Sequence, residues 1–397
     1  MKAVVFHGVG DIRLDTVDDP RIETPTDAIL KITGSAICGT DLHMVRGTMP
    51  GMKPGTILGH EAVGVIEEVG KDARNLRVGD RVVVPSTIGC GSCSYCRDGY
   101  YAQCDTANPN GSRAGTSFFG GPEMTGPFNG LQAEYARIPY ANVGLYKLPE
   151  GLSDDKALMI SDIFPTGYFG AELAEVGPGD VVAVFGCGPV GLFAIVSAFQ
   201  MGASRVLAVD ALEDRLKMAS AQGAETIDFS REDPVETILS LTGGIGADRI
   251  IDAVGVDAYR ATNGEDPESE RHAAELRAAA PETNPHDGNW APGNAPSQAL
   301  DWAVDSVAKA GSIGIIGVYP PTFRSFPIGM AMNRNLTMNM GNCNHRRYLP
   351  HLVSLCASGV VDPERILTKK EPMSGVLDAY GEFDRRQPGW MKVALEL

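Results

Sequence analysis

The sequence has no apolar run long enough to cross a bilayer and no excess of basic residues. It carries 34 lysines and arginines against 50 aspartates and glutamates, so its 397 residues have a formal net charge of −16 at pH 7. Nucleic acids and anionic membrane surfaces require basic faces, and neither is expected as a partner. The run 1–6 is also too short for the apolar region of a signal peptide, so a cytoplasmic location is expected.

Without a secretion signal, the eight cysteines are expected in a reducing compartment, where clustered cysteines more often bind metal than pair as disulfides. Four of them follow the spacing Cys-x2-Cys-x2-Cys-x7-Cys, and thiolates this close on short loops can surround one zinc ion. The glycines and serines between them are typical of turns rather than of a helix or strand. A pair of disulfides and chance clustering are the alternatives. The predicted structural zinc lobe spans 88–106, with the ligands Cys90, Cys93, Cys96 and Cys104.

The character of the sequence changes near residue 170. Before it, glycine-rich segments separate short β-like runs such as 28–32, 62–68 and 81–84, which predicts an irregular β-rich domain. From residue 180 onward, apolar runs such as 181–185 and 312–318 alternate with helical patterns such as 189–200 and 234–241, which predicts a doubly wound parallel sheet. The predicted fold class is therefore α/β. The sheet domain is expected over 171–342, and the β-rich domain over 1–170 with a return at 343–397.

Residues 257–300 fit neither pattern. They are rich in alanine, proline, glutamate and asparagine and show no sustained period apart from a short helical pattern at 268–279. Some forty residues without a strand are long for a loop. The segment is interpreted either as a lid or subunit contact or as a passive insertion.

A glycine-rich motif, GCGPVG at 186–191, directly follows the apolar run 181–185 and opens a helical pattern. In this setting Gly186 makes a tight turn, Gly188 lets a pyrophosphate approach the backbone, and Gly191 packs helix against strand. The free amides at the helix N-terminus favour the anionic phosphates. A plain strand-to-helix turn is the alternative.

Asp210 lies further along the chain, at a position where a carboxylate would accept hydrogen bonds from the ribose hydroxyls of the coenzyme. The same carboxylate would repel a 2′-phosphate, which favours NAD over NADP. Arg215 could reach the adenosine or pair with Asp210.

A second group of metal-ligand residues lies in the segments CGTDLH (38–43) and GHE (59–61). With these segments, the four-cysteine lobe and the glycine motif, the chain resembles the zinc-dependent medium-chain alcohol dehydrogenases over essentially its full length. The resemblance implies a GroES-like β-rich catalytic domain and a Rossmann coenzyme domain. It also implies that Cys38 and His60 bind a catalytic zinc.

The third zinc ligand in most members of that family is a cysteine in the segment that leads into the coenzyme domain. This chain has none there: residues 160–167 read ISDIFPTG, with Asp162 four residues before the threonine position, Thr166. An aspartate here resembles the glutathione-independent formaldehyde dehydrogenase branch and implies Asp162 as the third ligand. Zinc accepts carboxylate oxygen, and a thiolate, a neutral imidazole and a carboxylate leave the centre formally neutral. A helix N-cap or a surface acid is the alternative for Asp162.

Three protein ligands would leave a fourth position for a substrate oxygen, whose pKa zinc lowers before hydride passes to the nicotinamide. Thr40 and His43 resemble the hydroxyl-to-histidine proton relay of the family. Asp41 would orient His60, and Glu61 would either ease ligand exchange or form a buried ion pair. The resemblance also implies coenzyme contacts at Gly39, Thr40, His43, Thr166, Val190, Val254, Ile316 and Val318, and a pyrophosphate contact at Lys392.

The resemblance implies an oxidoreductase that transfers hydride between NAD and an alcohol or an aldehyde hydrate, with two zinc ions per chain and a dimeric or tetrameric assembly. Formaldehyde oxidation and aldehyde dismutation are two outcomes of that chemistry. Oxidation of a larger secondary alcohol or polyol is an alternative, and a nonenzymatic NAD-binding relative is another. Such a relative would be expected to lose the catalytic ligands, which this chain retains together.

Overall fold

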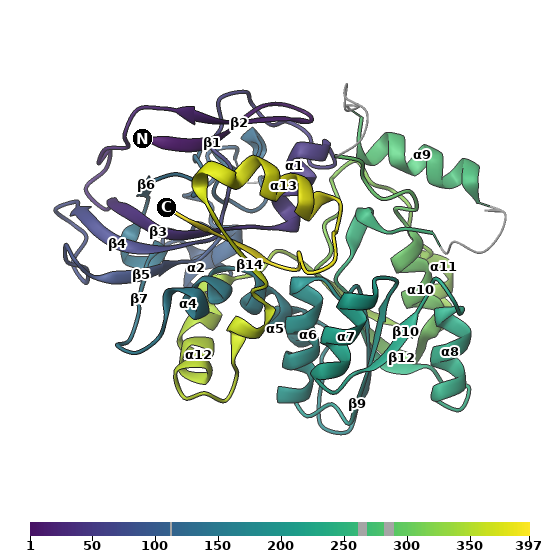
Figure 1. Cartoon of the computed structure of the whole chain (residues 1–397). Coiled ribbons are helices and arrows are strands. Elements are labelled where there is room, and N and C mark those ends of the chain that lie inside the picture. The colour runs from purple at the N-terminus through teal and green to yellow at the C-terminus, as the bar shows by residue number, and fades with distance from the viewer. Residues whose placement is uncertain (112, 261–267, 282–289) are drawn as a thin grey trace. The chain divides into compact units, whose positions relative to one another are not determined.

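The computed structural model describes residues 1–111, 113–260, 268–281 and 290–397, and Figure 1 labels most of its helices and strands. The chain divides into two compact units. Of the described residues, the first unit contains Met1–Pro165, Trp290 and Cys343–Leu397, and the second contains the remainder of Thr166–Asn342. The domain boundaries predicted after residues 170 and 342 fall close to these limits.

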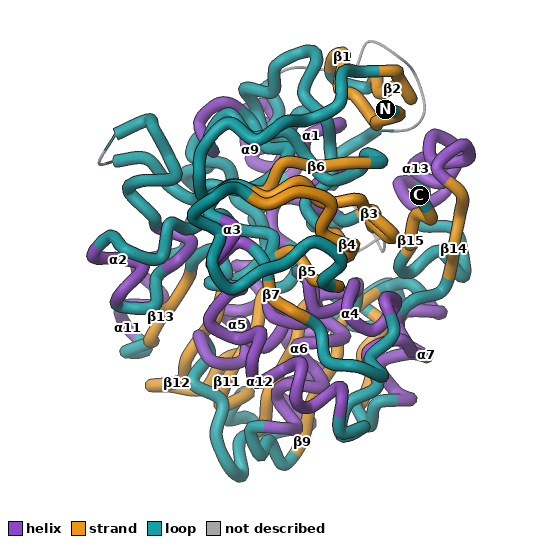
Figure 2. The backbone as a smooth tube through the Cα atoms, turned by 90° about the vertical axis from the view of Figure 1, so that its left-hand side faces the viewer, coloured by secondary structure: helices purple, strands orange, loops and turns teal. Residues whose placement is uncertain are grey.

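The first unit is built on a two-stranded antiparallel pair and a larger sheet that is antiparallel except for its β14–β15 edge, joined by long loops that Figure 2 shows in teal. β1 (Lys2–Gly8) and β2 (Asp11–Thr16) form a pair of their own. A seven-stranded sheet has the order β14-β15-β3-β4-β5-β7, with β6 also paired to β3. Its strands are β3 (Ala28–Ile37), β4 (Ala62–Val69), β5 (Arg81–Val84), β6 (Tyr135–Ile138), β7 (Tyr146–Lys147), β14 (Lys369–Pro372) and β15 (Val393–Glu396). Because β15 pairs antiparallel with β3, the carboxyl-terminal segment belongs to this unit, as the sequence predicted.

Alternation along the strands places the core of this unit. Leu30 and Ile32 on β3 point into one apolar cluster with Ile66 of β4. The helices are α1 (Gly39–Arg46), α2 (Ser94–Arg97), α3 (Ala141–Gly144), α4 (Asp154–Ser161), α12 (His345–Ala357) and α13 (Val376–Asp384), with the 3-10 turns η1 (Tyr101–Gln103), η2 (Glu123–Thr125), η4 (Pro363–Ile366) and η5 (Met373–Gly375). α5 (Ile163–Leu173) begins in the first unit and ends in the second. Across the described residues, each helix is too short or too polar to span a membrane.

The second unit contains a six-stranded parallel sheet in the order β10-β9-β8-β11-β12-β13, which is the strand order of a Rossmann fold. The strands are β8 (Val181–Phe185), β9 (Arg205–Asp210), β10 (Glu225–Asp228), β11 (Ala247–Asp252), β12 (Val307–Ile315) and β13 (Thr337–Met340). The helices are α6 (Pro189–Gln200), α7 (Glu213–Ala221), α8 (Pro234–Leu241), α9 (Ser269–Ala279), α10 (Gln298–Ser306) and α11 (Ile328–Asn333), with the 3-10 turn η3 (Gly255–Asp257). The predicted α/β class and the doubly wound sheet are confirmed.

Two local predictions need correction. The four-cysteine lobe contains a helical turn, α2, because the Cys93 side chain caps the helix by accepting a hydrogen bond from Cys96 N. β12 begins at Val307 rather than at 312, and it ends at Ile315 rather than at 318. Lys309 and Ala310 are exposed, and Ala310 has a φ of 59°, so the first half of this strand lacks the apolar pattern of a buried strand.

The predicted insertion leaves and rejoins the second unit at one place. Gly293 N donates to Asp257 Oδ1 at 3.2 Å, and Ala295 N donates to Ala258 O at 3.0 Å. Between these points the structure describes α9, close to the helix predicted at 268–279. Trp290 belongs to the first unit, where its backbone N–H donates to Asp384 Oδ2 at 2.7 Å. The parts of the segment at 261–267 and 282–289 lie outside the described residues, so the lid, the subunit contact and the passive insertion all stay predictions.

Candidate metal centres and coenzyme loop

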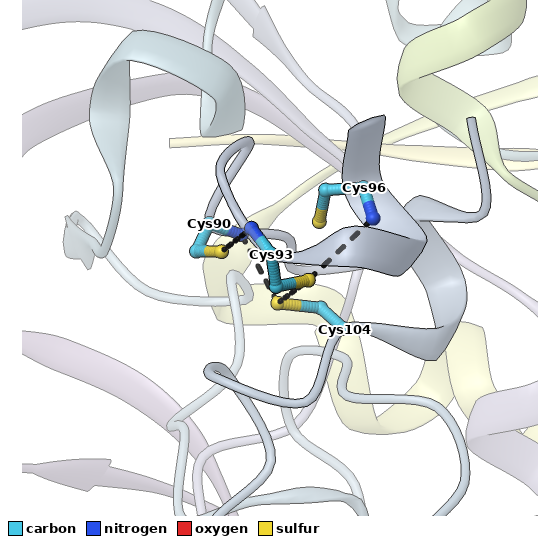
Figure 3. Close-up of side chains that lie close together, drawn as sticks. All are labelled: Cys90, Cys93, Cys96 and Cys104. Carbon is cyan, nitrogen blue, oxygen red and sulfur yellow. Dashed lines mark hydrogen bonds between the residues drawn. The ribbon is translucent and has the colours of Figure 1, made fainter. Parts of the chain in front are cut away.

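The four predicted lobe cysteines lie together on the segment that contains α2 and η1 (Figure 3). All eight cysteines of the chain lie within the described residues and are free thiols, which excludes the disulfide alternative for this structure. The four sulfur atoms lie within 4.8 Å of one another, and Cys93 Sγ is 3.8 Å from Cys104 Sγ. Sulfur ligands at about 2.3 Å from a tetrahedral zinc are separated by roughly 3.8 Å, so this lobe fits the ion.

Backbone N–H groups donate hydrogen bonds to sulfurs of this lobe, whereas burial raises the pKa of the Cys96 and Cys104 thiols. Cys90 N lies 3.2 Å from Cys104 Sγ, and Cys93 N lies 3.3 Å from Cys90 Sγ. Burial on its own would raise the pKa of the Cys90 thiol, but hydrogen bonds from Ser92, Thr106 and nearby amides outweigh it and lower that pKa to about 6. With four protein ligands, a bound zinc would have no position for a substrate.

The second predicted ligand set is also brought together. Cys38 follows β3, His60 precedes β4, and Asp162 lies between α4 and α5. Asp162 Oδ2 is 3.6 Å from Cys38 Sγ and 3.4 Å from His60 Nε2, and all three residues are buried. Ligand atoms around a tetrahedral zinc are separated by roughly 3.3–3.8 Å, so this set has the spacing of a metal shell.

His60 Nε2 provides an independent test of that fit. It is buried and has no hydrogen-bond partner among the described residues, although unpaired buried nitrogens are costly. Its other nitrogen, Nδ1, lies 3.1 Å from Asp41 Oδ1, so Nδ1–H donates and the lone pair of Nε2 faces Cys38 and Asp162. The donor set and the orphaned nitrogen therefore fit a zinc ion.

Asp41 holds two of the ligands at once. Its Oδ2 accepts the backbone N–H of Cys38 at 2.9 Å, while Oδ1 faces His60. Gln132 Nε2 lies 3.3 Å from Asp41 Oδ2, and Tyr380 OH donates to Gln132 Oε1 at 2.7 Å. This buried chain of hydrogen bonds fixes the orientation of Asp41. The expected contact between Asp41 and His60 is present, whereas Gln132 and Tyr380 belong to no local motif that would have identified them.

The surface-acid alternative for Asp162 does not describe its environment. Asp162 ends α4 and directly precedes α5, and it is 7% exposed. Burial on its own would raise its pKa, but the hydrogen bond from His345 and the neighbouring His60 imidazole outweigh burial and hold the pKa well below its usual range. Asp162 is therefore a buried carboxylate rather than a surface acid.

The two relay residues lie on α1, three positions apart and so on neighbouring turns of one face. Thr40 Oγ1 is 4.0 Å from Cys38 Sγ. His43 is buried, and its Nδ1 lies 2.7 Å from Thr48 Oγ1, a residue that the sequence reasoning did not identify. Gly39 is the first residue of the same helix.

The predicted glycine motif forms the turn between β8 and α6 in the second unit. Gly186 has a φ of 86°, a conformation that other residues rarely adopt. A Cβ on Gly191 would lie 1.8 Å from Gly186 O, so only glycine permits the helix to pack this close. A Cβ on Gly188 would meet nothing nearer than Arg215 Nη1 at 3.7 Å, which leaves space above the amides at the start of α6. These observations fit a dinucleotide phosphate.

The other predicted coenzyme residues of this unit lie at the same end of the sheet. Val254 packs against Gly186, since a Cβ there would lie 2.7 Å from Val254 Cγ2. Val256 N donates to Val318 O at 3.0 Å, and Ile316 N donates to Asp252 O at 3.0 Å, which links the ends of β11 and β12. Val190 is on α6 and Thr166 is on α5. In open parallel sheets, ligands bind beyond the carboxyl ends of the strands.

Asp210 ends β9 and uses both oxygens locally. Oδ2 accepts a hydrogen bond from the backbone N–H of Cys187 in the glycine loop at 2.8 Å, and Oδ1 accepts one from the backbone N–H of Ala211 at 2.8 Å. Arg215 Nη1 lies 3.7 Å from Asp210 Oδ2. The structure therefore shows the ion pair, which is one of the two predicted roles of Arg215.

Known proteins match both units. The family model for the alcohol dehydrogenase GroES-like domain matches residues 24–150, and that for the zinc-binding dehydrogenase matches residues 189–262. An uncharacterized zinc-type alcohol dehydrogenase-like protein of Bacillus subtilis is 37% identical over 400 residues, covering all of both chains. The chain belongs to the zinc-type alcohol dehydrogenase family.

Two further relatives bear on this dehydrogenase. The solved structure of an alcohol dehydrogenase from Thermus sp. ATN1 has a TM-score of 0.82 and 34% identity, covering 100% of this chain and 99% of that one. A glutathione-independent formaldehyde dehydrogenase of Pseudomonas aeruginosa is 39% identical over 270 residues, which are 65% of this chain and 66% of that protein. The family membership makes this chain an oxidoreductase acting on alcohols or aldehydes.

One residue of this dehydrogenase lies elsewhere than the resemblance implied. Lys392 is fully buried, and its Nζ lies 2.5 Å from Glu61 Oε1 and 3.0 Å from Ile37 O. It therefore neutralises Glu61 instead of presenting an exposed cation to a pyrophosphate. Glu61 therefore forms the buried ion pair that was one of its two predicted roles. One of its carboxylate oxygens also lies within 4.8 Å of the ligand atoms of Cys38, His60 and Asp162.

The sequence reasoning assigned no role to His345. In the structure its Nε2 lies 2.6 Å from Asp162 Oδ1. No motif marks this histidine. The signal that could have identified it is the predicted return of 343–397 to the first domain, which brings a buried histidine back beside the metal ligands.

Proposed function

We propose that this dehydrogenase oxidises a small aldehyde hydrate or a short alcohol with NAD, using a catalytic zinc held by Cys38, His60 and Asp162. The observation that carries the proposal is the buried Asp162 carboxylate, 3.4 Å from His60 Nε2 and 3.6 Å from Cys38 Sγ. The formaldehyde dehydrogenase of P. aeruginosa supports an aldehyde substrate by its similarity to this chain.

A zinc ion with three protein ligands supplies a Lewis acid for a substrate oxygen, and NAD supplies the hydride acceptor. The chain's own residues prepare and complete that chemistry. Asp41 keeps the proton of His60 on Nδ1, so that Nε2 offers a lone pair. Thr40 and His43 pass the hydroxyl proton of the substrate toward solvent, and Thr48 orients the His43 ring through Nδ1.

Two zinc ions per chain follow from the two ligand groups, one with four cysteines and one that mixes sulfur, nitrogen and oxygen. The preference for NAD rests on Asp210, whose carboxylate at the end of β9 would repel a 2′-phosphate. Arg215 reduces that repulsion through its 3.7 Å contact, so we expect a preference for NAD rather than complete exclusion of NADP.

A homo-oligomer in the cytoplasm completes the proposal. The edge strand β13 and helix α11 carry exposed apolar side chains, with Met340 63%, Met332 74% and Ile328 71% exposed. Clusters of exposed apolar residues of this kind favour an interface between protein chains. Light scattering on the purified protein separates a monomer, which would contradict this part, from a dimer or tetramer.

The function is tested by NADH formation with formaldehyde, short primary alcohols, a bulky secondary alcohol and a polyol, each with NAD and with NADP. We expect the highest kcat/KM with NAD and formaldehyde or a short alcohol. A marked preference for the secondary alcohol or polyol would favour the alternative substrate class. Aldehyde turnover without added NAD, together with coenzyme that copurifies, would indicate dismutation. No turnover of any of these substrates would contradict the proposal.

A further inference from the structure

The two carboxylate oxygens of Asp162 have different partners. Oδ2 faces Cys38 Sγ at 3.6 Å and His60 Nε2 at 3.4 Å, whereas Oδ1 lies 2.6 Å from His345 Nε2. One oxygen is therefore directed at the ligand cluster and the other is held by an imidazole. His345 is 3% exposed, so water does not compete for this contact.

The direction of this hydrogen bond follows from the groups that surround His345. The Asp162 carboxylate can only accept, so Nε2–H donates to it. On the other side of the ring, Nδ1 lies 3.1 Å from Thr87 Oγ1, which is itself 3.3 Å from Cys343 O. The Thr87 hydroxyl can donate to Nδ1 or accept from it while donating to Cys343 O. In both arrangements Nε2 keeps its proton, so the contact with Asp162 does not depend on the charge of His345.

The backbone at His345 is anchored separately. His345 is the first residue of α12, and the preceding residue, Asn344, accepts the backbone N–H of Ala102 through Oδ1 at 2.9 Å. Ala102 is in η1, inside the four-cysteine lobe and two residues before Cys104. The lobe therefore holds the start of the helix that carries His345.

We infer that His345 is a positioning residue for the catalytic zinc, because it holds one oxygen of Asp162 and leaves the other for the metal. This inference rests on the proposed function, since it presumes that Asp162 is a zinc ligand. The arrangement parallels the pair of Asp41 and His60, in which an outer group also fixes a ligand. In most metal sites an outer carboxylate orients an imidazole that binds the metal, whereas here an outer imidazole orients a carboxylate.

The consequence concerns metal affinity. Without the Nε2–H donor, the contact that holds Oδ1 is lost, and the carboxylate can rotate or offer both oxygens to the ion. Loss of an outer partner of a metal ligand typically weakens metal binding or activity by about 10–100-fold. The four-cysteine site has different ligands and serves as an internal reference.

The test compares His345→Leu, which removes the donor, with His345→Gln, which keeps an N–H on a chain of similar reach. His351→Gln is the matched control, because His351 is an exposed histidine on the same helix. The full-length proteins are loaded with zinc and titrated with a competing chelator, and the zinc retained per chain is measured. Cobalt-substituted proteins give an absorption spectrum that reports the coordination of the second site.

We expect His345→Leu to release its second zinc about 10–100-fold more readily and to shift the cobalt spectrum. His345→Gln should retain most of the affinity, and His351→Gln should match the wild type. Wild-type zinc retention and an unchanged spectrum in His345→Leu would overturn the inference. If His345→Leu does not fold, the comparison of Thr87→Val with Thr87→Ser decides: weaker zinc retention in the valine variant supports the inference, and equal retention overturns it. A wild-type protein that binds a single zinc would instead contradict the proposed function.

Discussion

Lys392 Nζ lies 2.5 Å from Glu61 Oε1, and neither side chain has any surface exposed to solvent. The two residues are 331 positions apart in the sequence and meet because β15 pairs with β3. The last residue of β3, Ile37, accepts a second hydrogen bond from Lys392 at 3.0 Å. A buried carboxylate next to a metal-ligand cluster needs such a counter-charge, because burial of an unpaired charge is costly. Burial raises the pKa of the Glu61 carboxyl, and the Lys392 ammonium opposes that rise.

Substitution of Lys392 by methionine should destabilise the protein by about 3–5 kcal/mol, because Glu61 is left as an uncompensated buried charge. The double variant Lys392→Met with Glu61→Gln should recover much of the loss. The midpoint of urea unfolding measures both effects, with the exposed Lys71→Met as the control. A Lys392→Met variant with unchanged stability and a raised KM for NAD would instead favour the pyrophosphate role that the resemblance implied.

Substitution of Asp41 by asparagine should lower activity or catalytic-zinc affinity by about 10–100-fold, because the acceptor that fixes His60 Nδ1–H is weakened. Gln132→Leu, one hydrogen bond further from the metal ligands, should have a smaller effect in the same direction. Zinc content after dialysis against a chelator, together with kcat, checks both variants. Equal zinc content and kcat in wild type and Asp41→Asn would contradict the orienting role of Asp41.

Substitution of Gly191 by alanine should abolish coenzyme binding, since its Cβ would lie 1.8 Å from Gly186 O and displace the turn. Gly329→Ala is the control, because no described atom beyond its chain neighbours and its own helix lies within 4 Å of a Cβ there. NADH fluorescence titration measures binding, and thermal unfolding shows whether the fold persists. Unchanged NADH affinity in Gly191→Ala would show that the turn can relax without loss of function.

Asp27 supports the start of β3, from which Cys38 is reached. It accepts hydrogen bonds from Thr24 N at 2.9 Å and Arg137 Nη1 at 3.1 Å. Burial on its own would raise the pKa of Asp27, but the bonds from Thr24, Arg137 and Glu23 outweigh it and lower that pKa below its ordinary value. Because the folded-state pKa is depressed, the stabilisation is fully present above the unfolded pKa of about 3.9 and is lost as pH falls through the lower folded value.

Asp27→Asn should therefore destabilise the protein at neutral pH by about 1–3 kcal/mol, and the difference from wild type should shrink below about pH 4. Asp18→Asn, at an exposed position, should follow the wild-type profile. Urea midpoints measured across the pH range provide the comparison. A difference between Asp27→Asn and wild type that is independent of pH would mean that the Asp27 charge contributes nothing.

The sequence predicted best those features that are fixed by neighbouring residues. β8, α6 and α8 begin and end where they were expected, because glycine and proline interrupt apolar runs at those positions. The four lobe cysteines are close in space because they are close in sequence. The start of β12 was misplaced by five residues because the exposed Lys309 and Ala310 interrupt its apolar pattern.

The metal centre was predictable only in part. The proposed ligands Cys38, His60 and Asp162 came from the resemblance, since no spacing rule joins residues this far apart. His345 and Gln132 were not found, because their contacts depend on tertiary packing of distant segments and leave no local pattern. The position of Lys392 was given by the resemblance, but its partner was not.

The central claim is that Asp162 completes a catalytic zinc site distinct from the four-cysteine lobe. The most direct measurement is the zinc content per chain of the wild type, Asp162→Ala and Cys96→Ser, each with its turnover of formaldehyde and short alcohols. The account predicts two zinc ions in the wild type. Asp162→Ala should keep the lobe zinc, lose the second ion and lose turnover, and Cys96→Ser should lose the lobe zinc. Two retained zinc ions and unchanged turnover in Asp162→Ala would contradict it.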